Sequence, residues 1–137
     1  MKVIGVFKEL EESEAELESI HDFANILSNP ERDLIVKYLK ESVDVMTYMG
    51  VSFDPFAVDR KAISGGYSIC SDGEWIWRVD LLYFVEHYRI GLPREFIDHV
   101  SNLDGIWRAD ENFIGQCYEE IMETYRRSLK SGSIVYR

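Results

Sequence analysis

Two neighbouring carboxylates are the first side chains in this sequence with the chemistry of a catalytic pair. Asp72 and Glu74 lie two positions apart in the stretch SDGEW, and paired carboxylates are the usual residues of general acid–base catalysis. Acid catalysis requires a carboxyl group shielded from water, whereas an Asp-Gly sequence predicts an exposed turn. We therefore interpret Asp72 and Glu74 as exposed turn residues that contact a partner and have no catalytic role.

The remaining reactive side chains do not form a known catalytic or metal-binding pattern. Glu95 and His99 are four residues apart in a predicted helix and supply at most half of a metal ligand set, because His-Glu-x-x-His is absent. Residues 63–68, ISGGYS, do not form the Gly-x-Ser-x-Gly turn of hydrolases. Cys70 and Cys117 are far apart and lie in no Cys-x-x-Cys motif, which predicts two reduced thiols. We predict no catalytic, cofactor-binding or metal-binding residues and no enzymatic activity.

The charge of the chain limits its partners. The 137 residues include 25 Asp and Glu against 15 Lys and Arg, a formal net charge of −10. Nucleic acids and anionic membranes repel such a protein, whereas a basic protein attracts it. No segment has the roughly 18 consecutive apolar residues of a membrane span, and no signal-peptide core is present. We expect a cytoplasmic protein, a monomer or weak homodimer, that binds no nucleic acid and no membrane.

A stripe of carboxylates is predicted near the start of the chain. Leu10, Leu17, Ile20, Ala24 and Leu27 recur at helical spacing and predict a first helix from Glu9. Acidic residues occupy another face of this helix with no basic residue among them, although like charges at this spacing destabilise a helix. A solvated surface explains the stripe, and so does a basic partner. We list as candidate partner-binding residues Glu11, Glu14, Glu18, Asp22, Asp72 and Glu74.

The stretch around Asp72 and Gly73 predicts a β-hairpin with a type I′ turn. Tyr67, Ile69, Trp75 and Trp77 are strand-forming residues spaced by two on either side of the turn. A short hairpin is not stable by itself. We therefore expect its aromatic face to pack on helices.

The other elements are predicted to be mainly helical. Asn29 and Pro30 suit the start of a second helix that ends near Gly50, and residues 51–65 are predicted to be an irregular connection. Further helices are expected over 81–89, capped by Asp80, over 93–100, and over 111–130, capped by Asp110. Residues 2–7 are a short strand or the lead-in to a helix, and the tail SIVYR is expected to add a short strand. We predict one domain, residues 1–137, with an α+β, predominantly helical fold of about five helices and one central β-hairpin.

Residues 71–100 carry a resemblance to a known group of proteins. The pattern consists of an aspartyl-glycyl turn, Glu-Trp-x-Trp, a helix with Tyr/Phe-Val, and Leu-Pro-x-x-Phe-x-x-His. It resembles small bacterial immunity proteins of polymorphic or contact-dependent-inhibition toxin systems. The resemblance covers less than a quarter of the chain.

The resemblance implies a cofactor-free protein that binds and neutralises a cognate toxin domain. A basic toxin, such as a nuclease, would suit the net charge. Two other hypotheses remain open, an acidic adaptor or regulatory protein with a different partner and an enzyme of an unfamiliar type. A toxin gene immediately upstream would separate the first hypothesis from the second.

Overall fold

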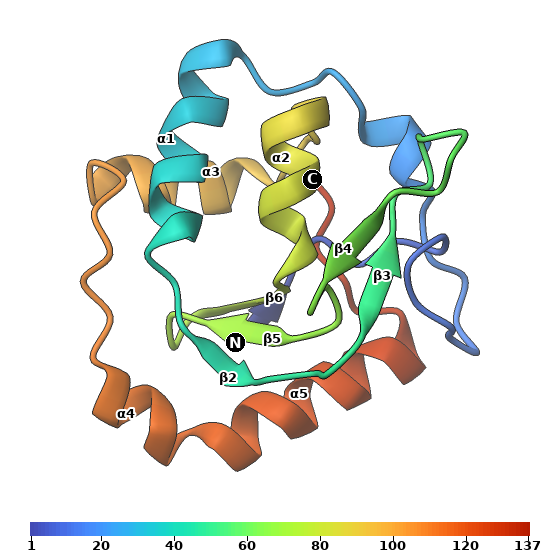
Figure 1. Cartoon of the computed structure of the whole chain (residues 1–137). Helices are drawn as coiled ribbons and strands as arrows, with labels where there is room; N and C mark the ends of the chain where they lie inside the picture. Colours follow the sequence, from blue (N-terminus) through green and yellow to red (C-terminus); the bar gives the residue numbers. More distant parts are fainter.

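The structure is a computed structural model that describes all residues from Met1 to Arg137, and it has an α+β architecture (Figure 1). The main sheet has four strands in the order β1-β6-β5-β2, with β1 parallel to β6 and the other pairs antiparallel. Its strands are β1 (Lys2–Val3), β2 (Asp44–Met46), β5 (Ile69–Ser71) and β6 (Trp75–Arg78). A second sheet contains only β3 (Val51–Phe53) and β4 (Ala62–Ser64). The helices are η1 (Ile20–Phe23, a 3-10 helix), α1 (Asn29–Lys40), α2 (Asp80–Tyr88), α3 (Arg94–Asn102), α4 (Glu111–Gln116) and α5 (Tyr118–Ser131).

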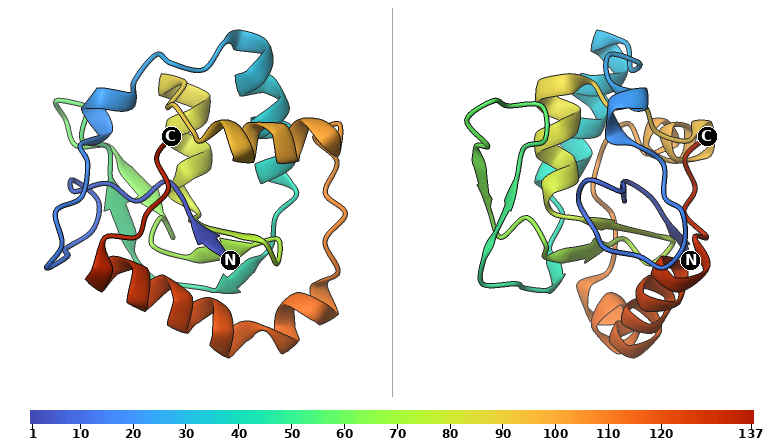
Figure 2. Two further views of the ribbon diagram at one scale, coloured as in Figure 1. Left: turned by 180° about the vertical axis from the view of Figure 1, so that it is seen from behind. Right: turned by 90° about the vertical axis from the view of Figure 1, so that its right-hand side faces the viewer.

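Helices cover both faces of the main sheet, with α1, α2 and α3 on one face and α4 and α5 on the other (Figures 1 and 2). Successive strand residues point to opposite faces, so β6 contributes to both halves of the core. Trp75 and Trp77 pack against Phe96 of α3, while Ile76 joins the cluster formed with Ile121 of α5. All four residues of β6 are buried.

The predicted hairpin is confirmed, with β5 and β6 joined through Asp72 and Gly73. The predicted type I′ turn is wrong, because that turn needs positive φ at both central residues and Gly73 alone has it, at 95°. The expected single aromatic face is also only partly right. Ile69 packs on the α5 side of the sheet, opposite Trp75 and Trp77, and Tyr67 is exposed.

The predicted first helix is wrong. Residues 8–18 form a loop whose ends meet where the Lys8 amide donates to the Glu18 carbonyl at 3.0 Å. The Glu9 carboxylate closes the loop further by accepting from Ser19 Oγ at 2.5 Å and from the Ile20 amide at 2.8 Å. The apolar side chains that suggested one helical stripe are buried in three different clusters, and a single straight helix cannot supply all three.

The prediction for residues 29–65 is partly wrong. The second helix begins as expected, but Ser28 is its cap, in a capping box with Glu31. The helix ends at Lys40, well before Gly50, because the following residues enter strand β2. Residues 51–65 are not irregular, since they contain the β3–β4 hairpin. The chain therefore has two hairpins and a four-stranded sheet, so it is less helical than predicted.

The later helices agree with the predictions in position, but four are present where three were predicted. Asp110 caps α4 by accepting from two backbone amides, as expected, and Gly132 follows α5 with a positive φ of 76°. The long last helix breaks at Cys117 into α4 and α5. Asp80 lies in the first turn of α2 but does not cap it, because its side chain is turned inward. No helix in the chain combines the length and apolarity needed to cross a membrane.

The packing of β6 gives a direct stability test. Trp77 is 1% exposed and touches the rings of Phe96 and Trp107, so Trp77→Ala should lower the free energy of unfolding by about 3–5 kcal/mol. Phe113→Ala is the matched control, because Phe113 is 54% exposed and its loss should change stability by less than about 0.5 kcal/mol. Urea denaturation measures both, and equal midpoints for the two variants would contradict this packing.

Candidate functional site

The six predicted partner-binding residues do not share one surface. Because residues 8–18 form a loop, the expected acidic face of a helix does not exist. Glu11 binds the buried Arg78 at 2.9 Å, and Glu18 binds Arg137 at 2.8 Å. Glu14 and Asp22 are exposed and belong to no ion pair.

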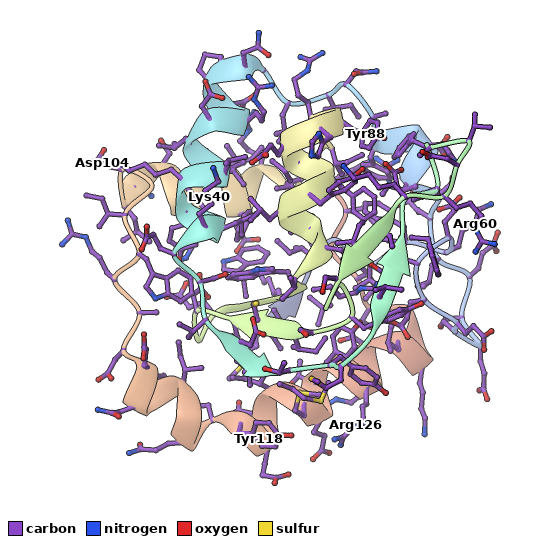
Figure 3. The ribbon with its side chains drawn as sticks, in the orientation of Figure 1. Lys40, Arg60, Tyr88, Asp104, Tyr118 and Arg126 are labelled. Atoms are coloured by element: carbon purple, nitrogen blue, oxygen red, sulfur yellow. The ribbon has the colours of Figure 1, made fainter.

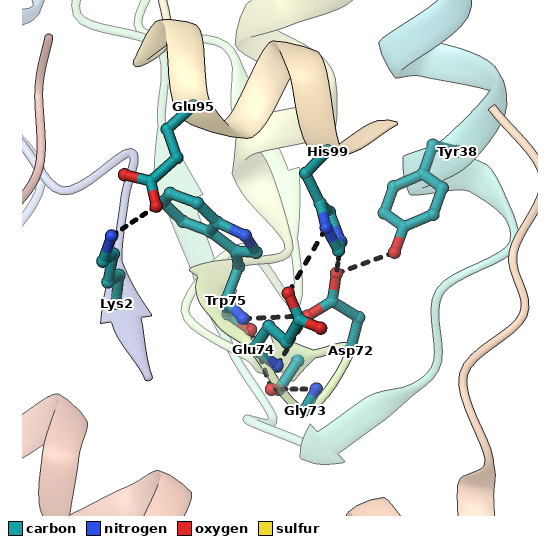
Figure 4. A network of polar contacts seen from close by, with 9 residues as sticks. Lys2, Tyr38, Asp72, Gly73, Glu74, Trp75, Glu95 and His99 are labelled. Carbon is teal, nitrogen blue, oxygen red and sulfur yellow. Dashed lines mark hydrogen bonds and ion pairs between the residues drawn. The ribbon is translucent and has the colours of Figure 1, made fainter. Parts of the chain in front are cut away.

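Asp72 is buried, contrary to the prediction of an exposed turn residue. Its side chain is 3% exposed and accepts four hydrogen bonds (Figure 4). One oxygen accepts from the amides of Glu74 at 2.9 Å and Trp75 at 2.8 Å. The other contacts the Tyr38 hydroxyl at 2.7 Å and His99 Nε2 at 2.8 Å. Asp72 thereby fixes the turn to helices α1 and α3, and only Glu74, 71% exposed, is available at the tip.

This network explains why the residues of the 71–100 pattern occur together. The turn Asp72 binds His99, and Trp75 packs edge-on against Phe96 at 5.3 Å between ring centroids. The His99 ring also approaches Glu74 at 3.4 Å, beside a cavity of ≈ 180 Å³. The pattern therefore describes how the hairpin attaches to α3, and its polar residues are largely occupied within the protein.

A second polar network lies around Arg78, which is completely buried. Its guanidinium makes two hydrogen bonds to the Asp80 carboxylate, from Nη2 at 2.6 Å and from Nε at 3.2 Å. Nη1 donates to the Leu10 carbonyl at 2.6 Å and to Glu11 at 2.9 Å. The Tyr67 ring covers the guanidinium at 4.3 Å.

The Arg78 network contains more negative than positive charge. Burial raises the pKa of the Asp80 carboxyl, although the adjacent guanidinium opposes that rise. Burial alone would lower the pKa of Arg78, but its carboxylate partners keep that pKa above its ordinary value. With its groups ionised, one guanidinium faces two carboxylates. Glu11 is the member of this set that reaches the surface, since its side chain is 22% exposed while those of Arg78 and Asp80 are 0% exposed.

A depression opens beside Glu11. It has a volume of ≈ 330 Å³ and is bordered by Glu11, Met46, Tyr48, Tyr67, Ile69 and Tyr125. The Tyr125 hydroxyl donates to Glu11 at 3.2 Å, so the carboxylate is held at the edge of this space. The rings of Tyr48 and Tyr67 lie 6.2 Å apart. An aromatic-lined depression with a carboxylate has the composition that binds a cation.

Exposed apolar side chains gather in the same part of the chain. Six of the eleven exposed large apolar residues lie between residues 48 and 67, and they are Tyr48, Met49, Val51, Phe53, Val58 and Tyr67. In β3 the usual alternation is inverted, because Ser52 points inward to bind Asp80 at 2.9 Å while Val51 and Phe53 face outward.

The β3–β4 hairpin is attached to the body of the protein by Asp54. This residue is 1% exposed and accepts from the hydroxyls of Tyr83 at 2.7 Å and Tyr88 at 2.5 Å, both on α2. Burial alone would raise the pKa of Asp54, but the bonds from Tyr88 and Tyr83 lower it overall. Arg60, in the loop between the strands, points outward (Figure 3). The outward-facing apolar residues of β3 are therefore held on a fixed support.

Sequence reasoning missed Arg78, Tyr48 and Tyr67 as members of this site. One signal was available, since Arg78 is a charged residue that directly follows the apolar run Trp75–Trp77, and a charge in a buried strand requires a partner. Nothing in the sequence identifies Glu11 and Asp80 as those partners.

No group of three or more His, Cys, Asp or Glu residues is arranged to hold a metal ion. No protein-family model, curated protein or solved structure matches this chain.

The burial of Asp72 predicts unequal effects for two neighbouring carboxylates. Asp72→Ala leaves several buried donors without an acceptor and should lower the free energy of unfolding by about 1–3 kcal/mol. Glu74→Ala removes only an exposed side chain and should change it by less than about 0.5 kcal/mol. Urea denaturation of the two variants measures the difference. Equal stabilities would mean that the Asp72 carboxylate is solvated.

The two thiols should differ in reactivity. Burial, reinforced by the nearby Asp44, raises the pKa of the Cys70 thiol to about 12, so at pH 8 only about one molecule in 10⁴ carries the thiolate. Cys117 is partly exposed. Under native conditions a disulfide reagent should modify Cys117 within minutes and reach Cys70 only after unfolding. Mass spectrometry of the labelled peptides checks this order, and rapid labelling of native Cys70 would contradict its burial.

Proposed function

We propose that this chain is a cytoplasmic immunity protein that binds a basic toxin domain and neutralises it. The observation that carries the proposal is the run of exposed apolar side chains between residues 48 and 67. Exposed apolar surface held on a fixed support is typical of a protein-binding site. A binding protein can neutralise an enzyme by covering its active site, which requires a surface of this kind.

The net charge and the resemblance support a basic toxin as the partner. A net charge of −10 accelerates encounter with a basic protein and disfavours acidic competitors. The resemblance of residues 71–100 to immunity proteins of bacterial toxin systems supports a toxin as that partner. The structural role of these residues, which attach the hairpin to α3, supports a shared fold and leaves the identity of the toxin open.

The proposal is tested by co-expression with the C-terminal domain encoded by the gene immediately upstream. We expect the domain alone to arrest growth, and this chain to restore growth and to purify with the domain in a stable complex. Association should slow as salt is raised, because opposite charges steer the encounter. Growth arrest that persists when this chain is present at equal levels would contradict neutralisation. A complex without restored growth would favour an adaptor.

A further inference from the structure

We propose that the depression beside Glu11 binds an arginine side chain of the protein partner, and that the exposed residues around it form the interface. We call this region the Tyr48–Tyr67 surface and define it by Glu11, Met46, Tyr48, Met49, Val51, Phe53 and Tyr67. The identity of the partner rests on the proposed function. The cation site itself can be tested on this chain alone.

The floor of the depression favours a cation. Glu11 shares its counter-ion, Arg78, with Asp80, so two carboxylates compete for one guanidinium. The Glu11 side chain is 22% exposed, and its Oε1 accepts no hydrogen bond, because Arg78 and Tyr125 both donate to Oε2. No Lys or Arg is among the six residues that border the depression. Lys8 borders two neighbouring depressions, which it shares with Glu11 and Glu12.

The walls of the depression select arginine among cations. Tyr48 is 55% exposed and Tyr67 37% exposed, and both rings border the space. A planar guanidinium stacks on aromatic rings and donates to a carboxylate at the same time, whereas an ammonium ion does so less well. One face of the Tyr67 ring is already covered by the Arg78 guanidinium at 4.3 Å, so the Tyr48 ring supplies the main stacking surface for an incoming guanidinium.

The residues that follow Tyr48 in the chain offer apolar contacts that would exclude water from a charge pair. Met49 is 96% exposed, and Val51 and Phe53 are each 43% exposed. Interfaces concentrate their binding energy in aromatic and arginine residues surrounded by such apolar contacts. A second copy of this chain is a poor occupant, because two molecules of charge −10 repel each other. A basic protein suits the floor of the depression, while the Phe53 ring is already covered by the guanidinium of Arg60 at 4.9 Å.

The hairpin tip is a weaker candidate for the same role. Asp72 accepts four hydrogen bonds within the protein and is 3% exposed, so its carboxylate has no remaining surface for a partner. Phe113 of α4 lies near this tip, since its ring is 3.5 Å from the position of a Cβ on Gly73. Substitution of Phe113 therefore tests binding at the hairpin tip. Phe113 is a matched control for Tyr48, because the two residues are 54% and 55% exposed.

The first experiment uses this chain and two short peptides. Acetyl-Gly-Arg-Gly-amide and its citrulline analogue, which has the same shape without the charge, are titrated into the ¹⁵N-labelled protein and followed by NMR. We expect shifts concentrated at Glu11, Tyr48 and Tyr67, and binding of the citrulline peptide at least about tenfold weaker. Absence of shifts at these residues, or equal binding of both peptides, would overturn the cation site.

Two surface variants test the position of the cation site and leave the buried Arg78 network intact. Tyr48→Ala should weaken binding of the arginine peptide about tenfold, while Phe113→Ala should leave it unchanged. Tyr48 bonds Ser68 Oγ through its backbone amide, so loss of the exposed ring should leave the urea midpoint near that of the parent. A loss of binding with Phe113→Ala, but not with Tyr48→Ala, would move the site to the hairpin tip and overturn the proposal.

The second experiment uses the toxin domain of the co-expression test. Tyr48→Ala should increase the dissociation rate of the complex at least about tenfold, and Phe113→Ala should not. If the toxin binds both variants as it binds the parent chain, the Tyr48–Tyr67 surface is not the interface, although the proposed function stands. If no toxin is neutralised, the proposed function fails, and the peptide titration still decides the cation site.

Discussion

Arg78 has no exposed surface, and burying a guanidinium costs several kcal/mol unless charges and hydrogen bonds compensate it. The fold meets this constraint with groups from separate parts of the chain. The N-terminal loop supplies the Leu10 carbonyl and Glu11, and the start of α2 supplies Asp80. Through these acceptors the network extends to Ser52 of β3 and Tyr125 of α5. The side chain at the end of β6 thus links the second sheet, two helices and the loop to the main sheet.

The same constraint has consequences at the surface. Asp80 draws Ser52 inward, and in a strand this turns Val51 and Phe53 outward. Arg78 holds Glu11 at the border of the aromatic-lined depression and lies beneath Tyr67. The outward position of Val51 and Phe53 and the position of Glu11 are therefore both tied to the network around Arg78. Glu11, the carboxylate of the proposed arginine site, is thus also a partner of the buried Arg78.

The features that could be predicted from the sequence depend on local chemistry. Gly73 specifies a turn whatever surrounds it, and Asp110 caps a helix by bonding to amides two and three residues away. The features that could not be predicted depend on distant partners. Residues 8–18 have helical spacing, but their conformation is set by Glu9 bonding to Ser19 and by Arg78 bonding to Leu10.

The candidate site shows the same limit. Glu11 has the right residue type for a partner-binding site, but the helix on which it was placed does not form. Strand β3 was missed although Val51, Ser52 and Phe53 alternate, because the strand has only three residues and the Asp54-Pro55 that follows predicts a turn. The sequence also does not show that the serine faces the core while the apolar residues face solvent. Tyr48 and Tyr67 are distant in sequence, and only the approach of their chain segments puts their rings 6.2 Å apart.

A double-mutant cycle between Arg78 and Asp80 tests most directly whether the buried network sets the fold. The free energies of unfolding of Arg78→Met, Asp80→Asn and the double variant are measured by urea denaturation against the parent chain. Arg78→Met should cost about 3–5 kcal/mol, because it leaves the buried Asp80 carboxylate without its guanidinium. Asp80→Asn should cost about 1–3 kcal/mol, because it weakens the buried hydrogen bonds while Glu11 still pairs with Arg78. The double variant should cost less than the sum by more than about 1 kcal/mol. Two small losses that add within about 0.5 kcal/mol would show that the network does not determine how these segments meet.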